Sequence, residues 1–350
     1  MSIALITGST GLVGSQSVSF FSRKGFKVIG IDNNLRKLFF GVDGDTRWIK
    51  KNLESEFKNY EHLNYDIRNF SKLEKIFKKY KKNINLIIHS AAQPSHDWAK
   101  ISPNVDFEVN AKGTLNLLRL TNKFCPDATF IFMSTNKVYG DNPNKLRITE
   151  KKTRYEINNN HKYFKGIDEK MSIDNNVHSF FGVSKSYADL LVQEYGKNIG
   201  LKTACFRAGC ITGPNHSGAK LHGFLSYLVK SSLIKKKYSI IGYKGKQVRD
   251  NIHSSDLIEC FWEFYKKPRK GEIYNIGGGR FSNCSIIEAL SFIQEETGIE
   301  IKKEISKQNR VGDHIWYISN MKKFKNHFPN WKQKYSTQKI IRELISSINF

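Results

Sequence analysis

The chain has 350 residues, of which 39% are hydrophobic and 13% aromatic, so it can bury a core in one large domain or two interlocked ones and is neither disordered nor fibrous. Its formal charge of +25 would suit a polyanionic partner, but the lysine runs are short, lie between apolar segments and match no nucleic-acid motif. We therefore expect solvated helix faces and no nucleic-acid site.

Short apolar runs alternate with helix-length amphipathic stretches through residues 1–206. The predicted strands cover residues 3–6, 27–31, 63–65, 86–89, 129–133 and 203–206. Helical periodicity between them is clearest over residues 109–121 and 184–195. This alternation is typical of βαβ units and predicts an α/β fold with a Rossmann-type doubly wound parallel sheet, covered by helices on both faces.

Residues 207–350 show a less regular pattern, with strands predicted only at 238–241 and 273–276. We interpret this part as a smaller mixed α/β region that binds the substrate and is interleaved with the first domain at their boundary. The polar segments 141–176 and 214–222 are predicted to be loops, which carry ligand contacts in folds of this kind.

A glycine-rich turn follows the first predicted strand, with glycines at positions 8, 11 and 14 and a helical pattern directly after them. Such a turn lets the backbone approach a pyrophosphate, whose charge is met by amides at the helix amino terminus. The second strand ends at Asp32, where a carboxylate can bind the ribose hydroxyls and would repel a 2′-phosphate. These features predict NAD rather than NADP, with Arg36 as the one residue that favours the alternative.

The five cysteines form no C-x-x-C pair, so the sequence supports neither a disulfide framework nor a metal site. The amino terminus runs directly into the first strand, and no apolar stretch approaches the ~18 residues of a membrane span. A soluble, cytoplasmic protein without membrane contact is expected.

The glycine spacing G-x-x-G-x-x-G, the pair Asp66-Ile67, the loop 89–93 and Asn110 together resemble the extended short-chain dehydrogenase/reductase family, and in particular its NAD-dependent nucleotide-sugar epimerases. The resemblance implies a set of cofactor contacts spread over the first domain. They are Gly8, Gly11, Leu12, Val13, Gly14, Asp32, Asn33, Arg36, Asp66, Ile67, Ala91, Ala92, Gln93, Asn110, Ser134, Lys185 and Ala208.

The family uses a Ser/Thr together with Tyr-x-x-x-Lys, in which the lysine lowers the pKa of the phenol that removes a sugar hydroxyl proton. The resemblance assigns these roles to Thr135 and Lys185, but Phe181 stands where the tyrosine is expected. Phe181 is an engineered substitution, a natural feature of a subgroup with another acid/base, or the mark of a protein that binds NAD without turnover. We favour the natural subgroup, because the rest of the site is intact.

The candidates for a substitute proton carrier are Cys210, His178, Lys137 and Lys185 itself. Tyr187 is excluded, because it lies on a different face of the predicted helix from position 181.

Beyond the Rossmann part, segment 245–256 with Arg249 and segment 310–314 with Arg310 resemble the family elements that bind the substrate diphosphate through guanidinium groups. Segments 134–141, 166–169 and 245–250 are most similar to the subgroup that epimerises C2 of a CDP-linked hexose; GDP, dTDP and UDP remain open. The implied substrate contacts are Gln93, Ser95, Asn136, Lys137, Cys210, Arg249, Arg310 and Asp313.

Two rival functions remain open. A 4,6-dehydratase needs an Asp-Glu pair after the Ser/Thr element for elimination, and this chain has Asn136 and Lys137 there. A silent NAD-sensing or RNA-associated protein would suit the missing tyrosine, but it has no need of Arg249 and Arg310. By resemblance, the two helices at 109–121 and 184–195 are expected to form a homodimer contact.

Overall fold

The computed structural model describes residues 2–216, 223–306 and 313–347. The chain forms two compact units. The first unit comprises Met1–Val138, Phe180–Arg207 and Ile258–Tyr274, and the second comprises Tyr139–Ser179, Ala208–Leu257 and Asn275–Phe350. The chain passes from one unit to the other after Val138, Ser179, Arg207, Leu257 and Tyr274.

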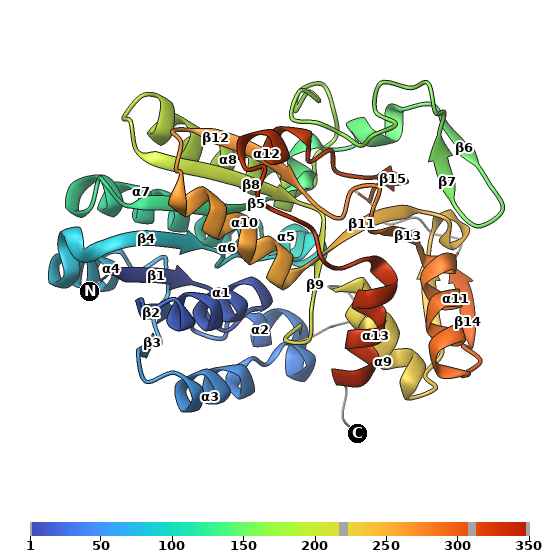
Figure 1. Ribbon diagram of the computed structural model, residues 1–350, viewed down its shortest axis with the longest axis horizontal. Helices are drawn as coiled ribbons and strands as arrows, with labels where there is room; N and C mark the ends of the chain where they lie inside the picture. The colour runs from blue at the N-terminus through green and yellow to red at the C-terminus, as the bar shows by residue number, and fades with distance from the viewer. Residues whose placement is uncertain (1, 217–222, 307–312, 348–350) are drawn as a thin grey trace. The chain divides into compact units, whose positions relative to one another are not determined.

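The first unit is built on a seven-stranded sheet with the order β12-β8-β5-β4-β1-β2-β3 (Figure 1). Its strands are β1 (Ile3–Thr7), β2 (Lys27–Ile31), β3 (Tyr60–Leu63), β4 (Ile84–His89), β5 (Thr129–Thr135), β8 (Lys202–Ala208) and β12 (Glu272–Ile276). The pairs β1–β2, β2–β3, β1–β4 and β4–β5 are parallel. The predicted doubly wound parallel fold is confirmed. Its strand order reverses between β1 and β4, which is where such sheets bind ligands.

Two strand predictions need correction. The third strand ends at Leu63 instead of beginning there, because it pairs with β2 from Tyr60 onward. Strand β12, predicted within the substrate region, extends the main sheet beside β8. The reason is burial: Tyr274 and Ile276 are fully buried, so this strand is stabilised by apolar packing that the local pattern does not reveal.

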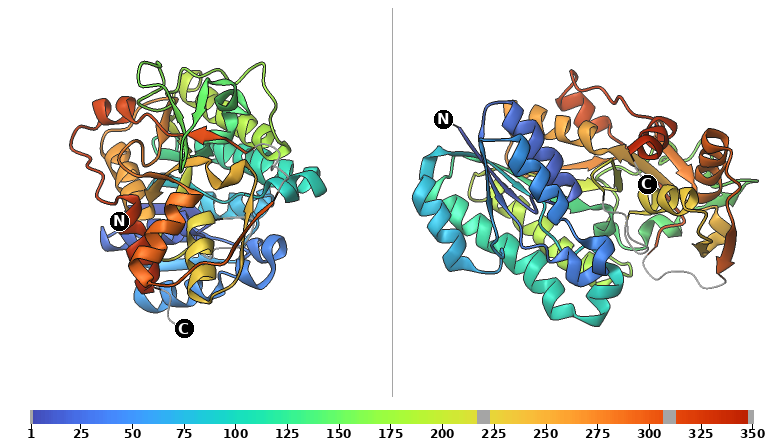
Figure 2. Two further views of the ribbon diagram at one scale, coloured as in Figure 1. Left: turned by 90° about the vertical axis from the view of Figure 1, so that its right-hand side faces the viewer. Right: turned by 90° about the horizontal axis from the view of Figure 1, so that it is seen from below.

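Helices cover both faces of the sheet (Figure 2). One face carries α1 (Leu12–Arg23), α3 (Arg47–Glu56) and the part of α10 (Ser254–Lys266) that belongs to the first unit. Aromatic contacts join these layers, such as Phe20 with Trp262 at 6.0 Å and Phe206 with Phe261 at 5.0 Å between ring centroids. The other face carries α4 (Phe70–Tyr80), α7 (Gly113–Phe124) and α8 (Phe180–Lys197). The short helices α2 (Arg36–Phe40), α5 (His96–Ile101) and α6 (Pro103–Phe107) lie in the loops after β2 and β4.

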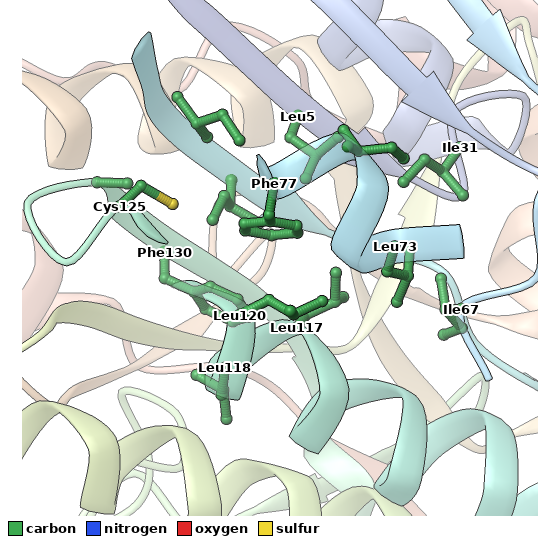
Figure 3. Packing of buried hydrophobic residues seen from close by; sticks show 14 of the residues in the cluster. Leu5, Ile31, Ile67, Leu73, Phe77, Leu117, Leu118, Leu120, Cys125 and Phe130 are labelled. Carbon is green, nitrogen blue, oxygen red and sulfur yellow. The ribbon is translucent and has the colours of Figure 1, made fainter. Parts of the chain in front are cut away.

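A continuous apolar cluster lies under α4 and α7 (Figure 3). Phe77 of α4 lies among side chains of α7 and of the sheet, and Phe77, Leu117 and Phe130 have no solvent exposure. Because interiors of this density tolerate little rearrangement, the helices and the loops at their ends are held in fixed positions relative to the strands.

The second unit is centred on β11 (Val248–His253). This strand pairs antiparallel with β13 (Asn283–Ser285) and parallel with β15 (Trp316–Tyr317) and β9 (Cys210–Thr212). Two further pairs stand apart: β10 (Tyr238–Ile241) with β14 (Lys303–Ser306), and β6 (Ile148–Glu150) with β7 (Tyr155–Ile157). Helices α9 (Phe224–Leu233), α11 (Ile286–Thr297) and α13 (Thr337–Ser347) share one apolar cluster, and α12 (Lys322–His327) follows β15.

The sequence missed β11 because several of its buried positions are polar. Asp250 and Asn251 have no solvent exposure, although both lie within β11. Asp250 accepts hydrogen bonds from the backbone amides of Ser319 (2.8 Å) and Gly279 (3.0 Å), and burial raises its pKa to about 6. A strand with buried polar residues that bond to distant segments lacks the apolar alternation on which strand prediction depends.

Candidate active site

The glycine-rich turn after β1 lies directly against the loop after β4. Gly8 has a φ of +69°, and a Cβ atom at this position would lie 2.7 Å from the backbone nitrogen of Ala91. At Gly14, a Cβ atom would lie 1.9 Å from the carbonyl oxygen of Gly8. Side chains at either position would therefore force the turn open. The free amides of α1, which begins at Leu12, follow this turn and suit a pyrophosphate.

The carboxylate of Asp32 is held beside this turn by two backbone amides. One oxygen accepts from Thr10 (3.1 Å) and the other from Asn34 (2.7 Å). Each carboxylate oxygen keeps a further lone pair, so Asp32 can still accept from ribose hydroxyls. Arg36 stacks on Phe40, with its guanidinium carbon 4.7 Å from the ring centroid, and burial lowers its pKa to about 10.

The residues predicted to contact adenine lie at the end of β3. Asn33 donates to Asp66 at 3.0 Å, so the structure brings the ends of β2 and β3 together through these two side chains. Asp66 also pairs with Arg68 at 2.7 Å. Partial burial by itself would raise the pKa of Asp66, but the hydrogen bonds from Arg68 outweigh it and the pKa is lowered. The neighbouring Ile67 is buried against Gly113, which has no room for a side chain there.

Asn110 organises the loop after β4. Its carbonyl oxygen Oδ1 accepts from the amide of Gln93 (3.0 Å), and its Nδ2 donates to the Gln93 carbonyl and to the hydroxyl of Ser184, each at 3.1 Å. It lies in a π-helical turn, Glu108–Lys112, that precedes α7. Such turns are rare and are found frequently at functional sites. Gln93 in turn donates to Asp106 and to the Ser95 carbonyl, each at 2.8 Å.

Lys185 is almost fully buried beneath β5. Its ammonium donates to the carbonyl of Met133 at 2.7 Å and lies 4.1 Å from the centroid of the Phe132 ring. Burial lowers its pKa to about 8, against weaker opposing effects that include Asp189. Phe181, one helical turn earlier on α8, is also buried, with 7% of its surface exposed. The predicted Phe181–Lys185 face therefore points inward.

Two neighbouring hydroxyls on β5 have different partners. Ser134 donates to Asp189, whose carboxylate also forms a buried ion pair with Arg207 at 2.7 Å. The Ser134 hydroxyl is thus part of a structural network. Thr135 is half-buried, and its hydroxyl accepts from the amide of Lys137 at 3.2 Å. Asn136, buried, and Lys137 lie in the following 3₁₀ turn, Asn136–Tyr139.

The sequence overlooked one side chain at this site. His96, the first residue of α5, has its ring centroid 5.0 Å from that of Phe181, with the two planes at 60°. Ser95, the preceding residue, caps α5 by accepting from the amide of Trp98. The sequence signal that could have identified His96 is its place three residues after Gln93, in the loop that follows β4.

Among the other side chains considered for proton transfer, His178 has its Nε2 atom 3.0 Å from the Ile173 carbonyl, and Tyr187 is 42% exposed on α8.

The remaining predicted residues belong to the second unit. Arg249 pairs with Asp313 at 2.5 Å and donates to the Val248 carbonyl, so two of the three residues expected at the diphosphate are neighbours. Arg310 lies outside the described residues. Ala208 is buried at the end of β8, and Cys210 is partly buried in β9.

Comparisons with known proteins agree with this arrangement. The sequence model of the NAD dependent epimerase/dehydratase family matches residues 4–277. The chain is 29% identical to CDP-paratose 2-epimerase of Salmonella typhi, over 97% of both chains. It is 27% identical to dTDP-glucose 4,6-dehydratase of Salmonella typhimurium, covering 97% of this chain and 86% of that one. In structure it is similar to UDP-glucose 4-epimerase from Bifidobacterium longum in complex with NAD+ and UDP, with a TM-score of 0.80, 19% identity, and 99% and 98% of the two chains covered.

The buried charge of Lys185 predicts a measurable pH dependence of stability. Because its pKa is about 8 in the folded protein against 10.5 for the free side chain, the unfolded state binds more protons between these values, and stability rises as pH increases through this range. The gain is about 3 kcal/mol from pH 7 to pH 10.5. Urea denaturation of the wild type and of Lys185→Met across this range should show the rise only in the wild type. In the control Lys51→Met, which alters an exposed lysine, the rise should persist.

Proposed function

Because the chain belongs to the NAD-dependent epimerase/dehydratase family, we propose that it binds NAD and epimerises a nucleotide-linked hexose. The observation that carries the proposal is the assembly of one cofactor site within the first unit. The Gly8 turn, Asp32 and the Asn110 network lie at the ends of β1, β2 and β4, and Lys185 lies beneath β5. The carboxylate of Asp32 favours NAD over NADP.

The proposed reaction inverts C2 of the hexose through a 2-keto intermediate, as in a CDP-paratose (CDP-tyvelose) 2-epimerase. Similarity to that enzyme over 97% of the chain supports this choice of carbon and of CDP. When NAD is bound, it supplies a reversible hydride acceptor. The chain orients the sugar, holds the hydroxyl proton while the keto form presents its other face, and returns the proton afterwards. The five cysteines are all free thiols, which suits a cytoplasmic setting for the enzyme.

The diphosphate of the substrate is proposed to bind at Arg249. Its side chain is largely buried, and Asp313 and the Val248 carbonyl hold it in one orientation. A guanidinium group that is already oriented loses less conformational entropy when it binds phosphate. Gln93, Ser95, Asn136, Lys137, Cys210 and Arg310 remain proposed contacts for the rest of the substrate.

A second candidate function is 4,6-dehydration, since a dTDP-glucose 4,6-dehydratase is also a relative. Elimination requires an acid for the leaving hydroxyl and a base at C5. The side chains after Thr135 are Asn136, which is buried, and Lys137, and neither is a carboxylate. Epimerisation, which needs no such pair, is therefore the better-supported reaction.

A homodimer is part of the proposal. The exposed side of α8 presents Phe180, Val183, Tyr187 and Leu190, with exposed fractions of 42–56%, and this spacing places them in one stripe. The ring of Phe107, 52% exposed, lies 6.0 Å from that of Tyr187 and extends the stripe. Such a contiguous apolar surface is typical of an interface, and a second copy of the chain would cover it symmetrically.

The proposed reaction can be tested directly. Purified protein is incubated with CDP-, GDP-, dTDP- and UDP-linked hexoses, and the stereochemistry of the sugar is followed by NMR. We expect inversion at C2 of a CDP-linked hexose without added cofactor, because NAD is regenerated in each turnover and can remain bound. A 4-keto-6-deoxy product would indicate dehydration instead, and an absence of conversion for every sugar would leave the protein as a silent binding module.

The role of Arg249 predicts a change in KM. In Arg249→Gln, the loss of charge-assisted hydrogen bonds to phosphate should raise KM about 10- to 100-fold with little change in kcat, since the diphosphate is bound equally in the ground and transition states. Arg147→Gln, which changes an exposed arginine of the same unit, is the matched control. Unchanged KM in the first variant would place the diphosphate elsewhere.

If the apolar stripe on α8 forms the dimer contact, a charged substitution within it should lower the molecular mass of the protein in solution. Leu190→Asp should convert a dimer to a monomer in light scattering after size exclusion, because an unpaired carboxylate would be buried at the contact. Ile234→Asp, a similar change at an apolar side chain that is 49% exposed in the second unit, should leave the dimer intact. A wild type that is monomeric at all concentrations would contradict the proposal.

A further inference from the structure

We propose that His96 is the catalytic proton carrier that substitutes for the missing tyrosine at position 181. This inference rests on the proposed function, since it names the side chain that accepts the sugar hydroxyl proton. It adds a residue of α5 to the catalytic residues that the sequence predicts, which are Thr135 on β5 and Lys185 on α8.

His96 lies beside the side chain at position 181. The ring of His96 lies against the ring of Phe181, at 5.0 Å between centroids and with the planes at 60°. Phe181 stands one helical turn before Lys185, where the family places its acid/base. His96 is a titratable group whose ring packs on that of Phe181. The imidazole is therefore one ring's distance from the side chain at position 181.

Hydrogen bonds hold the backbone that carries the His96 and Phe181 rings. The Ser95 amide donates to the Gln93 side chain at 2.6 Å, and Gln93 is tied to Asn110 by a hydrogen bond from its amide to Oδ1 and one from Nδ2 to its carbonyl. Asn110 also donates to Ser184, whose hydroxyl donates to the Phe181 carbonyl at 3.1 Å. One hydrogen-bonded network therefore holds the backbone beside both rings, and the relative position of His96 and Phe181 does not depend on flexible surface contacts.

A third contact anchors α5 from its other side. Trp98 donates its indole N–H to the Phe39 carbonyl at 2.7 Å, and the two rings are 5.3 Å apart. His96 itself is half-buried, and its backbone is fixed by these contacts. This combination of a fixed backbone and a partly exposed ring suits general-base catalysis.

The chemistry balances with imidazole in place of phenol. In the forward half-reaction, the hydroxyl O–H bond breaks and its proton passes to a ring nitrogen, while the C–H bond at the same carbon breaks and its electron pair leaves as hydride to NAD. In the return half-reaction, hydride re-forms a C–H bond on the other face, and the imidazolium returns the proton to oxygen. Imidazole, with an ordinary pKa of about 6.5, accepts a proton near neutral pH without the pKa depression that a phenol needs.

The Lys185 ammonium keeps a distinct role in this arrangement. It is bonded to the Met133 carbonyl and lies over the face of Phe132, so its contacts are with β5. The phenylalanine at position 181 then serves as an apolar surface that positions the imidazole, and lysine is not needed to lower the pKa of a phenol.

The test uses a set of full-length variants assayed for epimerisation of the CDP-linked hexose and for NAD content. His96→Phe and the milder His96→Asn should lose at least about 100-fold in kcat while retaining NAD. The double variant His96→Phe/Phe181→Tyr should regain at least about tenfold over His96→Phe, because the family tyrosine can resume the role beside Lys185. His327→Phe, at a half-buried histidine that ends α12, should stay within about threefold of wild type.

A readout independent of turnover is carbethoxylation by diethyl pyrocarbonate, followed by peptide mass mapping. NAD with CDP-glucose should slow the modification of His96 several-fold and leave that of His327 unchanged. The proposal is overturned if His96→Asn keeps more than a third of the wild-type kcat, if the tyrosine fails to rescue His96→Phe, or if ligands leave His96 unprotected. If the wild type epimerises no sugar at all, the proposed function fails first, which separates the two results.

Discussion

The close approach of Gly8 to Ala91 is the constraint on which the site depends. These two residues lie in the loops after β1 and β4, the adjacent strands at which the sheet order reverses, and a Cβ atom on Gly8 would collide with the Ala91 backbone. Only a glycine with positive φ brings the first turn this close. This approach fixes the position of the amides at the amino terminus of α1. It also brings the loop that carries Gln93 and His96 next to the glycine-rich turn after β1.

Polar groups hold that second loop in place. Asn110 is buried, yet both ends of its amide are used, and the π-helical turn on which it lies allows its side chain to reach Gln93 and Ser184 at the same time. Buried networks that are fully satisfied specify one arrangement of the backbone, because any alternative leaves a polar group without a partner in a region of low dielectric. The rigidity of the site therefore comes from hydrogen bonds on its polar side and from the apolar core on the other.

With phenylalanine at position 181, the side chain one helical turn before Lys185 has no proton to exchange. In a Tyr-x-x-x-Lys arrangement, the lysine is charged and acts on the phenol. Here Lys185 is buried with a lowered pKa, and an apolar ring stands before it. The imidazole that packs on this ring comes from a different helix, so the role proposed for His96 depends on the contact between α5 and α8 and not on the spacing of residues along α8 alone.

The sequence by itself determined the local features of the protein. It specified the glycine turn, the carboxylate at the end of β2, the Phe181–Lys185 spacing and the parallel sheet, because each depends on residues close together in the chain or on periodic apolar burial. Tertiary structure decided the rest. Strands β11 and β12 form because distant segments pair with them and bury them. Asp313 pairs with Arg249, and His96 contacts Phe181, which is 85 positions away in the sequence. These contacts arise only when the chain folds, since no local pattern encodes which polar or aromatic side chain a remote segment will place beside another.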